Sequence, residues 1–152
     1  MIALVAFLSG RDVVGSGGSS CYSEPEQLVG AFYARIDAMA SSGYLDDHVD
    51  AVEELIEGQA AEVVAADVAY FAGTDIRQVG RTAVATIEAS DASAGTIAAR
   101  YRANIVLDVS GVSYVRDGAA DVVTNRTSDM VPVQLTLSDA GGCLAVSRID
   151  FP

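Results

Sequence analysis

An alternation of apolar and polar residues over positions 97–109 is the feature that most constrains this chain. Its odd positions are apolar or aromatic, and they carry Ile97, Ala99, Tyr101, Ala103, Ile105, Leu107 and Val109. Its even positions are mostly polar or charged, and they carry Ala98, Arg100, Arg102, Asn104, Val106 and Asp108. Residues two apart on a strand share a face, so the pattern predicts a long strand with one buried face and one wetter face. The apolar face of such a sheet needs another layer packed on it.

The residues before this strand are typical of helices. Ser23 is placed to cap a helix, with Pro25 in the first turn and Glu26 completing a capping box. Apolar residues then follow at helical spacing, at Leu28, Phe32, Ile36 and Met39. A second helix is predicted from Asp46 or Asp47 to Gly58. The segment 59–72 fits either a helix, by its Ala- and Glu-rich start, or a strand, by its β-favouring end.

From Thr74 onward the pattern is typical of strands. A strand region over 76–88 is broken by Gly80, and the long strand is expected to bend at Gly111 and continue through 112–115. A turn is predicted at 116–118, and the chain is predicted to return over 120–126. The last two strands, from Val131 and from Cys143, form a hairpin around the turn at 139–142. Its second strand changes phase, which predicts a bulge near Ser147.

Helices followed by antiparallel strands predict an α+β fold. The N-terminal helices are expected to pack on a curved antiparallel sheet of four or more strands. At 152 residues, the chain has room for one such domain, which we place at residues 23–152.

Residues 1–22 are expected to form a separate segment. Met1–Leu8 is wholly apolar, and Gly15–Ser20 has the composition of a flexible linker. An apolar run this short cannot cross a bilayer, which takes about 20 residues. It is therefore either the remnant of a membrane anchor, which implies an extracytoplasmic tethered domain, or an extra strand or short helix of the fold, which is compatible with a cytoplasmic protein.

Charge and cysteine content narrow the function classes. The net charge is −12, which repels phosphate backbones and excludes nucleic acid as a partner. All nine basic residues are arginines, so there is no lysine for a Schiff base or a phosphate loop. Cys21 and Cys143 either form a disulfide in an oxidising compartment or are small buried residues in a reducing one.

With these elements, the chain resembles the nuclear transport factor 2-like superfamily of cone-shaped α+β domains. The resemblance rests on the leading helix 24–39, the strand 97–109 and the closing hairpin VPVQLTLSDAGGCLAVSRIDFP at 131–152. Cys143 stands where many members carry an aromatic residue. One branch of the superfamily implies membrane-tethered accessory domains, such as Mce-associated and conjugal-transfer proteins. Another implies small binders and enzymes similar to SnoaL-like cyclases and ketosteroid isomerases, which work in the mouth of the cone.

No residue pattern predicts catalysis, and we expect no cofactor and no metal site. The only histidine, His48, is interpreted as a solvated residue near a helix N-terminus. Tyr101 shares its strand face with no Asp, which argues against an isomerase-like acid and tyrosine pair. If a pocket exists, its expected lining is Phe32, Tyr33, Tyr70, Phe71 and Tyr101. An interface is expected on the open sheet face, at Arg100, Arg102, Asn104 and Asp108.

These observations favour a non-catalytic protein-interaction or assembly module, an accessory domain of a membrane-associated transport or transfer complex. Its partner would be another protein or a second copy, with a membrane tether at the N-terminus. A small-molecule binder or enzyme that uses the cone pocket is the first alternative. A virion protein or other structural assembly protein, whose N-terminal strand pairs with a neighbour, is the second.

Overall fold

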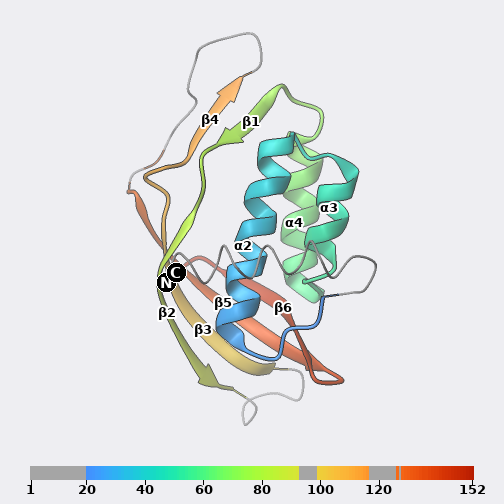
Figure 1. The fold of residues 1–152 in the computed structure, drawn as a ribbon, viewed down its shortest axis with the longest axis vertical. Helices are drawn as coiled ribbons and strands as arrows, with labels where there is room; N and C mark the ends of the chain where they lie inside the picture. The colour runs from blue at the N-terminus through green and yellow to red at the C-terminus, as the bar shows by residue number, and fades with distance from the viewer. Residues whose placement is uncertain (1–19, 93–98, 117–125, 127) are drawn as a thin grey trace.

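Three helices precede six strands along the described chain, which confirms the predicted α+β fold (Figure 1). The computed structural model describes residues 20–92, 99–116, 126 and 128–152. The helices are α2 (Pro25–Ser42), α3 (Asp46–Glu53) and α4 (Gly58–Phe71). The strands are β1 (Ile76–Val79), β2 (Ala83–Asp91), β3 (Ala99–Asp108), β4 (Ser113–Arg116), β5 (Met130–Ala140) and β6 (Cys143–Asp150). The segment Met1–Leu8, most of the linker over 15–20, residues 117 and 118 of the predicted turn and most of the return segment 120–126 lie outside the described residues.

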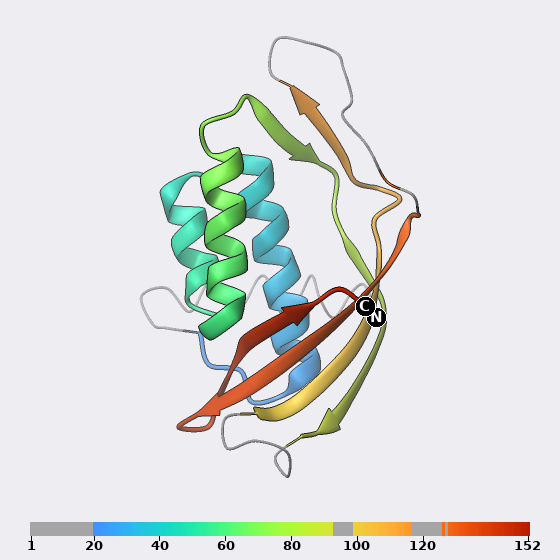
Figure 2. The same ribbon diagram turned by 180° about the vertical axis from the view of Figure 1, so that it is seen from behind.

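The main sheet is antiparallel, with the strand order β2-β3-β5-β6, and it curves around the helices (Figures 1 and 2). The alternation predicted for β3 is confirmed, because Ala103, Ile105 and Leu107 are buried while Arg102 and Asn104 are exposed. The buried residues face the core supplied by the helices, which includes Leu28, Phe32, Val52, Leu55 and Val64. The sheet therefore has one face covered by helices and one face turned away from them.

A second, two-stranded sheet of β1 and β4 continues the β2–β3 pair beyond a bend. The bend passes through Gly80, whose φ of +89° is a left-handed conformation that glycine adopts without strain. Asp37 of α2 holds this region in place. Its Oδ1 accepts hydrogen bonds from Gln78 Nε2 at 2.7 Å and Thr82 Oγ1 at 2.8 Å, and its Oδ2 accepts one from the Thr82 amide at 2.8 Å. Because Asp37 and Gln78 are both buried, these bonds fix the bend against the helix.

Two helix ends differ from the prediction. The N-cap of α2 is Glu24 and not Ser23, and its side chain makes no capping bond, because Pro25 is already the first helical residue. Helix α3 stops at Glu53 instead of reaching Gly58. Leu55 and Glu57 pair with β6 instead: Val146 N donates to Leu55 O at 2.8 Å, and Glu57 N donates to Val146 O at 2.9 Å. These bonds use backbone groups at the edge of β6, and the segment that makes them cannot remain helical, so α3 ends early.

Strand β6 contains the predicted bulge. Thr136 lies opposite Arg148 and Leu137 lies opposite Val146, so Ser147 is the extra residue that changes the phase. The N-terminal end of the described chain also packs on β6, since Leu144 N donates to Tyr22 O at 2.7 Å. A disulfide joins Cys21 to Cys143 beside this contact. Residues 20–22, which the sequence assigned to the linker, thus belong to the folded domain.

Candidate functional site

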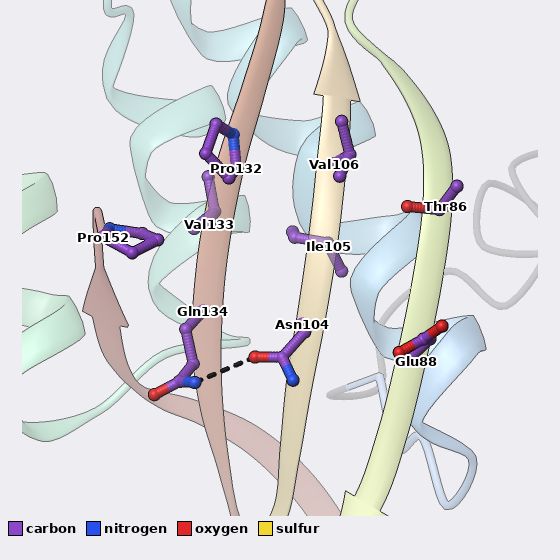
Figure 3. A pocket seen from close by; sticks show the side chains of 9 residues that line it. All are labelled: Thr86, Glu88, Asn104, Ile105, Val106, Pro132, Val133, Gln134 and Pro152. Carbon is purple, nitrogen blue, oxygen red and sulfur yellow. Dashed lines mark hydrogen bonds between the residues drawn. The ribbon is translucent and has the colours of Figure 1, made fainter.

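The uncovered face of the main sheet carries a shallow groove of about 370 Å³ (Figure 3). Its floor includes Val106 of β3 and Pro132 of β5, which lie side by side on neighbouring strands. Beside them, Gln134 Nε2 donates a hydrogen bond to Asn104 Oδ1 at 2.8 Å. The remaining lining residues are Thr86, Glu88, Ile105, Val133 and Pro152. The groove thus combines an apolar floor with amide and carboxylate groups, as protein-binding surfaces do.

Three of the four residues predicted for an interface lie on this face. Asn104 lines the groove, and Arg102 and Asp108 occupy positions of the same parity along β3. A side-chain and a backbone hydrogen bond with Ser110 hold the pKa of Asp108 below its usual value. The register of β3 shifts between Ala99 and Tyr101, so this parity does not extend to Arg100. The Nη1 of Arg100 lies 2.6 Å from Asp91 Oδ2, and its guanidinium lies 4.8 Å from the centre of the Tyr101 ring.

A second cavity, of about 240 Å³, lies between helices α2 and α4 and the covered face of the sheet. We call it the mouth cavity. Most of its wall is apolar, formed by Phe32, Ile36, Val63, Val64, Leu107, Val109, Ile149 and Phe151. Its polar groups come from five residues on four elements and one connecting segment: Tyr33, Asp67, Gln78, Thr82 and Tyr114.

The titratable groups at the mouth cavity are perturbed by burial. Burial raises the pKa of the Tyr33 hydroxyl far above its ordinary 10.0, and it raises that of Tyr114, where Asp37 and Asp67 add to the effect and Arg126 opposes it. Both tyrosines are therefore neutral hydrogen-bond donors at physiological pH. Asp67 lies at the rim and is exposed to solvent, and the partial loss of water around its carboxyl raises the pKa of that group.

Of the five residues predicted to line a pocket, Phe32 and Tyr33 do so and the other three do not. Tyr101 lies six residues from Leu107 along β3, which is roughly 20 Å at the rise of a strand. Phe71 stacks on Tyr44, with ring centres 5.6 Å apart, and Tyr70 is 72% exposed next to it. The predicted aromatic residues are thus split between the cavity, the far end of β3 and the end of α4.

Sequence reasoning did not single out Asp67, an acidic residue that lines the mouth cavity. It considered only the face of the long strand, whereas Asp67 reaches the cavity from α4. The sequence does hold a signal for it, because Val63, Val64 and Asp67 share a face if the segment 59–72 is a helix. Tyr114, Gln78 and Thr82 were also missed, since they lie on short strands or bends whose orientation no periodicity reveals.

The other sequence-based interpretations concern metals, His48 and the membrane. Among the described residues, no group of three or more His, Cys, Asp or Glu side chains is arranged to hold a metal ion. His48 lies in the first turn of α3, and its backbone amide donates to Leu45 O at 3.0 Å. None of the helices in the described segments is both long and apolar enough to cross a membrane.

No protein-family model matches this sequence, and no curated protein matches it either. Among solved structures, the chain is similar to the intermembrane space region of the chloroplast protein ARC6, known from a crystal structure. The TM-score is 0.49 and the identity 9%, over 79% of this chain and 90% of that one. At this TM-score, the likeness assigns neither a family nor a function.

Proposed function

We propose that this domain is a non-catalytic protein-interaction module, and that it binds its partner through the uncovered face of the main sheet. One observation carries the proposal: helices cover one face of β2-β3-β5-β6, and no described helix or strand covers the other (Figures 1 and 2). That other face holds the groove of Figure 3, where the side chains of Val106 and Pro132 place apolar surface among polar groups. Binding to a surface of this kind is favourable when a complementary protein excludes water from its apolar centre.

The negative charge of the chain limits the kinds of protein that can be its partner. At a net charge of −12, two copies of this chain repel one another, and so does any acidic partner. Glu88 lines the groove, and Asp150 lies opposite the lining residue Gln134 and is paired with Arg148 at 2.8 Å. These charges favour a different protein, with a neutral or basic surface, over self-association.

The disulfide supports a location outside the cytoplasm. Cys21 is exposed and bonded to Cys143, and a disulfide of this kind persists in oxidising compartments and is reduced in the cytosol. The apolar run Met1–Leu8 and the linker at 15–20 are the basis for proposing a membrane tether. Together they favour an accessory domain of a membrane-associated transport or transfer complex.

The test is the native mass of the full chain after gentle solubilisation from its own cells. The wild-type chain should elute in a complex larger than the monomer. Val106→Arg should release the monomer, because it places a long cation on the groove floor. Val79→Arg is the matched control, since Val79 is 48% exposed on β1, away from the groove, and this variant should keep the complex. A complex that survives Val106→Arg, or a wild-type chain that is monomeric, contradicts the proposal.

A second candidate function is the binding of a small molecule in the mouth cavity, as in the cone pockets of the binders and enzymes of the superfamily. The observation that favours it is the position of Tyr33, Asp67 and Tyr114 around one largely apolar space. Apolar walls with a few convergent polar groups are typical of ligand sites.

A further inference from the structure

We propose that the mouth cavity binds a small organic cation, a ligand with an apolar body of about one ring and a protonated amine, with Asp67 as the counter-ion. The proposal rests on the second candidate function and names its ligand class.

The size of the cavity fits such a ligand. An apolar cavity of about 150 Å³ holds one benzene molecule. The mouth cavity, at about 240 Å³, has room for one substituted ring. Larger bodies, such as fused ring systems, would need the walls to move apart, and these walls include the well-packed side chains of Phe32 and Val64.

The walls favour an apolar body with a polar end. Phe32, Tyr33, Tyr114 and Phe151 contribute aromatic rings, and the faces of such rings attract cations. The hydroxyls of Tyr33 and Tyr114 make no hydrogen bond to another described residue. Neutral phenols of this kind can donate to an acceptor on a ligand or hold a water molecule beside it.

Charge decides between a cation and an anion. Five described arginines pair with Glu54, Asp75, Asp91, Asp129 and Asp150, and among the described residues Asp67 forms no ion pair. Asp37 lies close enough behind the wall to raise the pKa of Tyr114. Arg126 is the cation felt at Tyr114, but it is already paired with Asp129 and donates to Val112 O. An anionic ligand would therefore meet an excess of negative charge, whereas an amine at the rim would supply a partner for Asp67.

The test compares three probes that share one body: benzylamine, benzyl alcohol and benzoate, each titrated into the full chain by two-dimensional NMR. Benzylamine should bind at least about tenfold more tightly than benzyl alcohol, and benzoate should not bind. This is the order expected when a carboxylate at the rim of the cavity faces the ligand's polar group.

Two variants locate the binding site. Asp67→Asn keeps the shape of the side chain and should weaken benzylamine about tenfold, to the level of benzyl alcohol. Glu88→Gln removes one negative charge on the opposite face of the sheet, in the groove of Figure 3, and should leave the affinity unchanged. Circular dichroism should show both variants folded as the wild type is.

Two sets of results would contradict the proposal, one for the cation alone and one for the cavity as a ligand site. If benzylamine and benzyl alcohol bind equally and Asp67→Asn changes neither, the cation assignment is overturned and the cavity remains a binding site. If no probe binds, or if Glu88→Gln weakens benzylamine as much as Asp67→Asn does, the cation assignment and the mouth cavity as a ligand site are both overturned.

Discussion

Gly80 and Gly111 approach each other so closely at the bend of the sheet that a Cβ atom added to Gly80 would lie 1.8 Å from the Gly111 carbonyl oxygen. This contact lets β1 and β4 continue the β2–β3 pair at an angle to the main sheet. The bend in turn positions Gln78 and Thr82 against Asp37 and at the wall of the mouth cavity.

Gly80→Ala should therefore destabilise the fold by more than about 2 kcal/mol, since it adds a backbone clash to the left-handed strain of roughly 1–2 kcal/mol. Gly142→Ala is a matched control, because Gly142 has a φ of +90°, against +89° at Gly80, but no atom within 4 Å of its added Cβ. The Gly142→Ala variant should lose only the unfolding free energy that corresponds to left-handed backbone strain. Urea unfolding followed by circular dichroism measures both, and equal losses in the two variants would contradict this account of the bend.

The disulfide should be a large contributor to stability. It closes a separation of 122 residues, and cross-linking a loop of about 100 residues stabilises by up to about 4.7 kcal/mol through the unfolded state. The double variant Cys21→Ser, Cys143→Ser should lose several kcal/mol of unfolding free energy. Reductant should lower the wild type to the same level and leave the double variant unchanged. A wild type that is insensitive to reductant would show that the bond is absent or adds nothing.

Buried tyrosines should make the fold sensitive to alkali. The ordinary pKa of tyrosine is 10.0, whereas burial raises that of Tyr44 to about 12 and that of Tyr33 further. The folded chain thus holds protons that the unfolded chain has released. Their contribution to the unfolding free energy is intact below pH 10.0 and falls as pH rises through the folded pKa values.

Tyr33→Phe removes the group with the largest of these shifts, so it should flatten the alkaline decline. The measurement is urea unfolding at pH values on both sides of 10.0, with phenolate absorbance recorded in parallel. The wild type should show a late-ionising phase that the variant lacks. An unchanged decline in Tyr33→Phe would place the sensitivity in other groups.

Much of the sheet could be predicted because its signals are local. The alternation over β3 identifies Ala103, Ile105 and Leu107 as buried, since every second residue of a strand shares a face. The phase change between Val146 and Ile149 locates the bulge at Ser147 in the same way.

Features set by contacts between distant segments could not be predicted. Helix α3 stops early because Leu55 and Glu57 complete the edge of β6, about ninety residues later in the chain. The segment Gly58–Phe71 has β-favouring residues at its end, and packing of α4 on β6 overrides them. Asp67 and Tyr114 both line the mouth cavity because the sheet bends at Gly80. The periodicity of a sequence indicates which residues share a face, but not which residues of different elements come together.

Photo-crosslinking from the uncovered sheet face tests the interaction module most directly. A photoreactive amino acid replaces Val106 in the full chain, expressed in its own cells, and in a second chain it replaces Glu62, which is exposed on α4. We predict one adduct of defined mass, with a protein other than this chain, from position 106 and none from position 62. An adduct from position 62 alone, the same adducts from both positions, or none from position 106 would contradict the assignment of the partner to this face.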